Sequence, residues 1–410
     1  MTVADPRAGW TRAELSALVR EYLLIGHLVD RAGMSHLIGP YGRDGMAAIA
    51  VDEWMGASPV YTRRMQRALG FVGDDVVTVF KGMQLDIGAP PEFMDFRYTV
   101  HDADHGEFEL AHCGALADVE PMGEDFVVAM CHHIEDPTFD ATALATHPGA
   151  QVRPVHRPPR VPADRHPHCH WTVAIDRSVG PQPDPDVTVR MAGTLAATVE
   201  LATGAPEPGD DGRRDYAGAL EADLDLGAFD RPTLLRLADE VALQAHLLTM
   251  SFLAAVADRH GIGAARDVGV RQLTGLAGVA ADRLARLLGA PADLDGVAAV
   301  LAVHPVLRPA AYVSCAVERE ASGLRVVLGP CAALDETDVL GWPRLLAEGA
   351  DAALGALVRA VDDRAVVARA ATSGDEAAAW TVTRGDEAQP ESADVVLTRF
   401  STGADFVFRR

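Results

Sequence analysis

The sequence predicts an α+β protein made by tandem duplication of one unit, in which N-terminal helices lead into a mostly antiparallel sheet with a crossing helix. Three observations support this prediction. The chain has 410 residues, 49% of them hydrophobic, which is enough for two ordinary domains. Helical periodicity gives way to strand alternation within each half. The chain also aligns with itself, which predicts a first copy at 11–202, a linker at 203–229 and a second copy at 230–410.

The internal repeat is visible without gaps over the first third of each copy. A shift of 219 residues aligns 12–90 with 231–309, and 17 of these 79 positions are identical. Slightly smaller shifts then pair Cys113 with Cys331 and Trp171 with Trp380. The stretch between the copies is rich in Pro, Gly and Asp, as a linker is expected to be.

The elements of the first copy follow from periodicity and from turn residues. Apolar residues at spacings of three and four predict helices over 12–32, 43–69, 74–87 and about 122–135, the last ending at Asp136-Pro137. Alternation predicts strands over 94–101, 106–112, 169–176, 186–191 and 195–202, with a Pro-rich crossing at 154–167.

Composition excludes several classes of function. A net charge of −23 argues against nucleic acid as a partner, because phosphate binding needs clustered cations. The single lysine, Lys81, makes Schiff-base chemistry a poor candidate. No signal peptide or membrane span is expected, so we predict a cytoplasmic protein that acts on a small-molecule substrate, and a homodimer stays open.

Histidines and cysteines concentrate in the first copy, between residues 101 and 170. The second copy loses nearly all of them, which points to chemistry rather than to core filling. Thiolate and imidazole ligands favour zinc, with iron or haem as alternatives. The candidate metal ligands are Cys113, Cys131, His132, His168, Cys169 and His170. On a strand, His168 and His170 point to one face and Cys169 to the other, so either the two imidazoles or the thiolate reach a shared site.

Acidic and basic residues near these ligands suggest further roles. Glu135 and Asp136 lie four residues after Cys131 and His132 on the predicted helix, where either carboxylate is placed to take a proton from a zinc-bound water. Arg153, Arg157 and Arg160 are candidates for clamping a substrate carboxylate, or else they cover acidic surface. A solvated His-Pro-His-Cys-His loop at 166–170 and a plain buried Cys113 are the alternatives to a metal site.

A strand that ends in Cys113, then a helix with Cys131 followed closely by Asp136, resembles a known arrangement. Over about residues 12–140 the chain is similar to the L-2-amino-thiazoline-4-carboxylic acid hydrolase family and to the related vinyl-reductase-like domains. This resemblance implies a hydrolase that acts on a small heterocyclic amino acid or a similar carboxylated ring. The duplication and the segment 166–170 are departures from the family's pattern.

The leading prediction is therefore a metal-assisted hydrolase of a small carboxylated substrate, with its site in the first copy. The alternative is a metal- or haem-binding small-molecule sensor in which the second copy transmits the signal. A third hypothesis, a non-catalytic protein whose repeated unit serves assembly, predicts no bound metal.

Overall fold

The structure of the protein is a computed structural model that describes residues 5–409. The α-helices are α1 (Arg12–Met34), α2 (Ile38–Ala68), α3 (Val76–Gln84), α4 (Gly114–Val119), α5 (Glu124–Val128), α6 (Glu135–Leu144), α7 (Asp186–Ala192), α8 (Leu195–Thr198), α9 (Arg231–Leu288), α10 (Leu294–Val303), α11 (Ala332–Asp335), α12 (Trp342–Ala347), α13 (Asp351–Val361) and α14 (Ala393–Thr398). The strands are β1 (Met94–Val100), β2 (His105–Cys113), β3 (Ala150–His156), β4 (Cys169–Ile175), β5 (Cys315–Glu320), β6 (Gly323–Leu328), β7 (Ala365–Ala370) and β8 (Ala378–Arg384).

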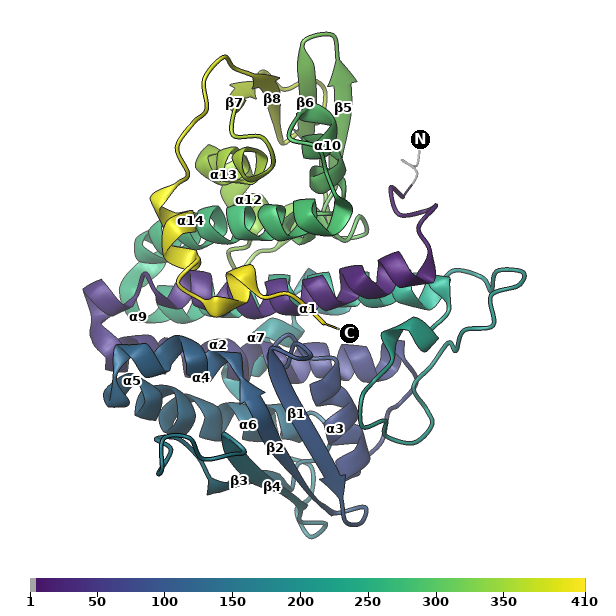
Figure 1. Cartoon of the computed structure of the whole chain (residues 1–410), viewed down its shortest axis with the longest axis vertical. Coiled ribbons are helices and arrows are strands. Elements are labelled where there is room, and N and C mark those ends of the chain that lie inside the picture. The colour runs from purple at the N-terminus through teal and green to yellow at the C-terminus, as the bar shows by residue number, and fades with distance from the viewer. Residues whose placement is uncertain (1–4, 410) are drawn as a thin grey trace.

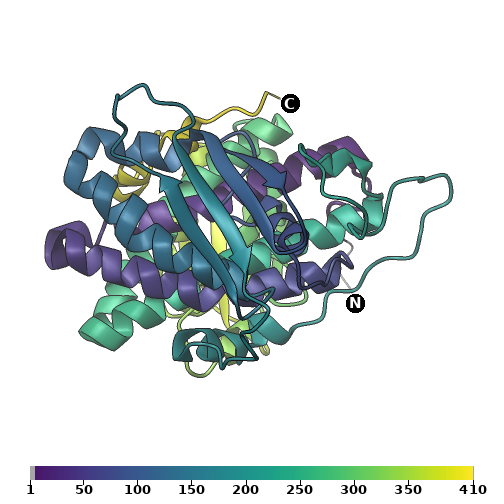
Figure 2. The same ribbon diagram turned by 90° about the horizontal axis from the view of Figure 1, so that it is seen from below.

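Two antiparallel four-stranded sheets have the same strand order. The first runs β1-β2-β4-β3 and the second β5-β6-β8-β7. Between the sheets lies a layer of long helices, α1, α2 and α9, with the first sheet below it and the second above it (Figure 1). From below, the first sheet lies across these helices (Figure 2). The predicted α+β class is confirmed, and the matching sheets are what a repeated unit requires.

The long helices of the two halves kink at matched glycines. In α2 the kink is at Gly42, with a φ of 71°, and in α9 it is at Gly261, with a φ of 85°. These positive φ values suit glycine because it lacks a Cβ. The pair is one of the identities in the sequence repeat, so the same backbone bend occurs twice.

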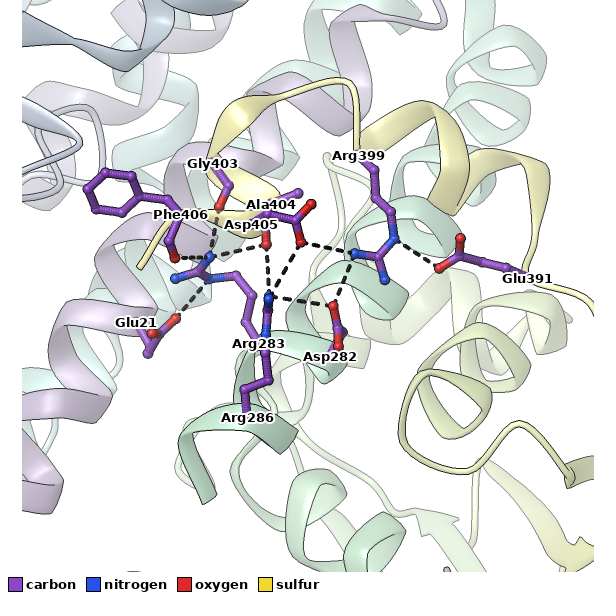
Figure 3. Close-up of polar contacts among 10 residues, drawn as sticks. All are labelled: Glu21, Asp282, Arg283, Arg286, Glu391, Arg399, Gly403, Ala404, Asp405 and Phe406. Carbon is purple, nitrogen blue, oxygen red and sulfur yellow. Dashed lines mark hydrogen bonds and ion pairs between the residues drawn. The ribbon is translucent and has the colours of Figure 1, made fainter. Parts of the chain in front are cut away.

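Each half also anchors the other through reciprocal contacts. Arg64 of α2 binds Glu240 of α9, with Nε 2.9 Å from Oε2, and Arg283 of α9 binds Glu21 of α1 at 2.8 Å. Both arginines are buried, and both also donate to backbone carbonyls of a short segment that ends a copy. Figure 3 shows the second of these arrangements, in which Arg283 reaches the carbonyls of Gly403 and Phe406.

Two more reciprocal contacts follow the same rule. Arg12 donates to the carbonyl of Gly227, and Arg231 donates to the carbonyl of Ala8. Asp118 accepts hydrogen bonds from Ser401 and Thr402, and its counterpart Glu336 accepts from the amides at the start of α8. The two copies are therefore interlocked by equivalent contacts rather than joined only by the linker.

One helix within residues 5–409, α9, is long and apolar enough to cross a membrane by length and composition. The apolar window of α9 is 89% buried inside the protein, where it packs against α1, α2 and α13. Its apolar character is accounted for by this central place in the core.

Three predictions for the second part of the first copy were wrong. Residues 186–191 and 195–202, predicted as strands, form the short helices α7 and α8. Their β-branched residues favour strands locally, but α7 packs on α2 and Thr188 donates to the carbonyl of Met55, while Thr194 caps α8. Strand β3 occupies part of the predicted crossing, and as an edge strand it tolerates Pro154.

The crossing helix is longer than predicted. It does not end at Asp136-Pro137 but continues from α5 through a π-helix (η2, Ala129–Ile134) into α6, which ends at Leu144. Pro137 lies in the first turn of α6, where the absence of an N–H is tolerated.

Candidate active site

Three cysteines and one glutamate meet on the inner face of the first sheet. Cys113 ends β2, Cys169 begins the neighbouring strand β4, and Cys131 lies on the π-helix that crosses them. All three thiols are buried in one hydrophobic cluster with Trp171 and Phe108. Each thiol interacts electrostatically with Glu135, the first residue of α6. The fold thus assembles this thiol–carboxyl cluster from three separate segments, namely β2, β4 and the crossing helix that carries both Cys131 and Glu135.

The π-helix determines which side chains reach this cluster. A π-helix closes hydrogen bonds one residue later than an α-helix, is less stable, and occurs frequently at functional sites. Here Cys131 points inward and is 2% exposed, whereas the Nε2 of His132 lies 2.7 Å from the carbonyl oxygen of Pro158. His132 therefore fixes the loop after β3 and is not directed at the thiols.

Glu135 is the most unusual titratable group of the cluster. The pKa of Glu135 is raised to about 8, mainly by burial and also by the charge of Asp136, against the opposing effect of the guanidinium groups of Arg157 and Arg31. The Oε2 atom is buried and accepts no hydrogen bond from any residue in the range 5–409. A carboxyl group in this state exchanges protons near neutral pH, as a general acid or base must.

The thiols are held in their neutral form. Burial, followed by the charge of Glu135, raises the pKa of Cys113 to about 12. The same causes raise the pKa values of Cys131 and Cys169 above their ordinary range. Cys113 Sγ accepts a hydrogen bond from the amide of Leu116 at 3.3 Å and touches Met94 Sδ at 3.9 Å. At neutral pH these groups are thiols, so they line the site rather than attack a substrate.

Asp30, Arg31 and Glu53 extend the cluster into the helical layer, and sequence reasoning missed them. Arg31 Nε lies 3.3 Å from Asp30 Oδ2, and the indole of Trp54 donates to Asp30 Oδ1 at 3.3 Å. Glu53 is completely buried, and burial together with the charge of Asp30 raises its pKa well above the ordinary value. Arg31 links this group to the thiols, because it interacts with both Glu53 and Cys113.

The signal for these three residues is present in the repeat. The gap-free shift of 219 residues aligns Asp30, Arg31 and Glu53 with Thr249, Met250 and Gln272. The charges thus disappear from the second copy just as Cys131 and Cys169 do. Comparing charged residues of the first helices between the copies, and not His and Cys alone, identifies them.

The three arginines predicted to bind substrate all have acidic partners, and only one lies at the cluster. Arg153 pairs with Asp140 and Arg160 with Glu120 at the periphery. Arg157 lies over the ring of Trp171, 5.7 Å from its centre, and acts electrostatically on Glu135 and Cys131. The carboxylate of Asp136 binds Arg157, so Asp136 positions that guanidinium rather than joining the thiols.

The six residues predicted to bind metal do not surround one point. His170 bonds Glu107 on the outer face of the sheet at 2.8 Å, and His132 holds Pro158. His168 accepts a hydrogen bond from the amide of Cys113, and burial lowers its pKa to about 4. Among residues 5–409, no group of three or more His, Cys, Asp or Glu side chains is arranged to hold a metal ion. Of the six candidate ligands, the fold brings the three cysteines into one cluster, while His132 and His170 bind other partners, and the opposite directions of Cys169 and His170 follow from the alternation of strand faces.

Comparison with known proteins gives no further guide. No protein-family model, no curated protein and no solved structure matches the chain. The resemblance over residues 12–140 therefore stays a prediction from the sequence, and a proposed function rests on the site itself.

Proposed function

We propose that the first copy is a hydrolase of a small carboxylated substrate, with Glu135 as its proton-transfer group. One observation carries this proposal. The carboxyl group of Glu135 has a pKa of about 8, and its buried Oε2 accepts no hydrogen bond from residues 5–409. Two guanidinium groups, those of Arg157 and Arg31, act on it. The aligned residue of the second copy is Ala353, which carries no charge.

The chemistry assigned to Glu135 is general acid–base catalysis. In ring opening, the water oxygen bonds to the electrophilic carbon, the carbon–heteroatom bond breaks, and one water is added in total. Glu135 is mostly protonated at pH 7 and donates its proton to the departing heteroatom, and it then takes a proton from the water. Arg157 supplies the positive charge for the substrate carboxylate, and its stacking on Trp171 fixes its orientation.

The reaction is tested with a panel of carboxylated five-membered heterocycles that includes 2-amino-thiazoline-4-carboxylate. Ring opening is detected by mass spectrometry as a mass increase of one water molecule in the compound. We expect wild-type protein to open at least one compound, Glu135→Gln to slow it by about a hundredfold or more, and activity to fall above about pH 8 as Glu135 loses its proton. Glu109→Gln, on the outer face of β2, is the matched control and should retain activity. An active Glu135→Gln variant, or a wild type that opens nothing in the panel, rules the proposal out.

Zinc is a prediction from the sequence, and no three His, Cys, Asp or Glu side chains among residues 5–409 are arranged to hold it. Elemental analysis of native protein beside Cys131→Ala addresses zinc separately. A stoichiometric metal that is lost in the variant would place it at the thiols, and a haem would show a Soret band.

A further inference from the structure

A cavity of about 640 Å³ lies along the free edge of β1, away from Glu135 and Cys131. Its volume is within the usual range of small-molecule sites. It is bounded by α1, by β1, by the end of the linker and by the C-terminal segment. Met94 and His112 line it from the sheet, and Met94 separates it from Cys113.

Arg20 of α1 lines this cavity without a bonded partner. It forms no hydrogen bond or ion pair with any residue in the described chain. Ser16, one turn earlier, is only 6% exposed, and its hydroxyl also has no partner among residues 5–409. A guanidinium and a hydroxyl, one turn apart on the same helix, thus face a common space.

In the second copy, the residue that corresponds to Arg20 forms a buried ion pair within the chain. At the shift of 219 residues, Arg20 matches Asp239 and Leu226 matches Arg7. Arg7 is fully buried and binds Asp239 at 2.7 Å and Asp5 at 2.7 Å, so the charges there are neutralised from within the chain. In the first copy Leu226 stands at the position of the partner, and Arg20 has no ion pair.

We infer that this cavity is a binding site for a small organic monocarboxylate, with the carboxylate on Arg20 and Ser16 and an apolar body against Leu23, Phe96 and Phe406. A carboxylate matches the planar donor fork of a guanidinium. The three apolar side chains line the same cavity and give the rest of the ligand a surface to bury.

The acidic residues of the cavity restrict the ligand to a single negative charge. All four have partners: Asp95 and Asp223 on Arg97, Asp225 on the amide of Gly227, and Glu92 on the amide of Arg409. They are not free to bind a cation. Four carboxylates against the guanidinium groups of Arg20, Arg97 and Arg409 leave the lining with a formal net charge of −1, which opposes a phosphate or a dicarboxylate.

The second copy builds one wall of this site. Phe406 lines the cavity, and its carbonyl accepts a hydrogen bond from Arg283 at 2.9 Å (Figure 3). The ring of Phe406 packs on Phe93, with centroids 5.3 Å apart. The wall is therefore held in place before any ligand arrives, which lowers the ordering cost of binding.

The test uses benzoate, its neutral analogue benzamide and inorganic phosphate as probes, with affinities measured by calorimetry on the full chain. We expect benzoate to bind wild type about tenfold or more tightly than benzamide, as charge-assisted hydrogen bonds allow. Phosphate should bind more weakly than benzoate. Arg20→Gln should abolish the preference for benzoate, and Arg20→Lys should retain part of it.

The control is Arg67→Gln, which removes an exposed arginine that has no partner within residues 5–409 and lies outside the cavity. Melting temperatures of all variants confirm folding. The inference is overturned if wild type does not bind benzoate, if it binds phosphate as tightly, or if the preference survives in Arg20→Gln. Benzoate has no ring bond to hydrolyse, so this result is independent of the hydrolase proposal.

Discussion

The two halves of the protein share their connections and differ in their interiors. One buried ion pair between the halves occurs twice, as Arg64–Glu240 and as Arg283–Glu21. Beneath the first sheet, in contrast, lies a buried group of ionisable side chains. The aligned positions of the second half carry neutral residues. Residues that are shared by both halves therefore serve the structure. Residues that occur only in the first half are the candidates for a specific chemistry.

The asymmetric residues are also the ones that are costly to bury. Burying Asp30, Arg31, Glu53 and Glu135 costs free energy that Thr249, Met250, Gln272 and Ala353 do not cost. The second half shows that the scaffold forms without these charges. Under the proposed function, these charges serve binding or catalysis in the first half.

The largest expected effect tests the symmetric part. Arg64→Ala and Arg283→Ala should each lower the free energy of unfolding by about 3–5 kcal/mol, because each leaves a largely buried carboxylate without its partner. Denaturant titration measures this loss. The exposed Arg67→Ala should stay within about 0.5 kcal/mol of wild type. Clearly unequal losses in the two arginine variants would break the structural equivalence of the halves.

The next effect concerns pH and has no counterpart in the second half. The folded state holds the pKa of Glu135 at about 8, above the ordinary value of 4.5, so folded protein binds more protons between these pH values. The stability that this proton provides is fully present below about pH 4.5 and is lost as pH rises through about 8.

Glu135→Gln should therefore gain stability over wild type as pH rises from 5 to 9, by on the order of 2–5 kcal/mol. Denaturant midpoints at several pH values measure the difference. A difference between the two proteins that does not change with pH would show that Glu135 is already ionised in the fold.

A third prediction transplants the second half into the first. Replacing Asp30→Thr, Arg31→Met and Glu53→Gln together installs the matched residues. Removing these three charges together should leave stability unchanged or raise it by about 1–4 kcal/mol, while ring opening is lost. Arg31→Met alone is the contrast, since it leaves Asp30 and Glu53 without their cation and should destabilise. A folded triple variant with full activity would detach these residues from the proposed function.

The smallest effect is a difference in thiol reactivity. Cys331 is partly exposed, whereas its match Cys113 is 3% exposed with a pKa raised to about 12. Under native conditions at pH 8, a maleimide should label Cys331 well before Cys113, Cys131 and Cys169, as peptide mapping by mass spectrometry would show. Rapid labelling of Cys131 would mean that the thiol–carboxyl cluster opens to solvent.

Sequence prediction succeeded for long periodic segments and failed where long-range contacts decide. The three predicted N-terminal helices and the hairpin at 94–112 agree with α1 to α3, β1 and β2. Residues 186–202 carry β-branched side chains, yet they fold as helices against α2. Within the candidate site, the fold brings Cys113, Cys131, Cys169 and Glu135 into one cluster, while His132 and His170 point elsewhere.

By itself, the sequence determined the α+β class and predicted a repeat, because periodicity and self-similarity are properties of the chain alone. Alignment of the two copies also shows that Cys131, Cys169 and the buried charges occur only in the first copy. Only the tertiary structure decided which side chains meet, because a π-helix and the alternation of strand faces set the direction of each one. It also decided that Glu135 titrates near neutrality and that Arg20 lacks a bonded partner in the described chain, since both depend on what surrounds a group in space.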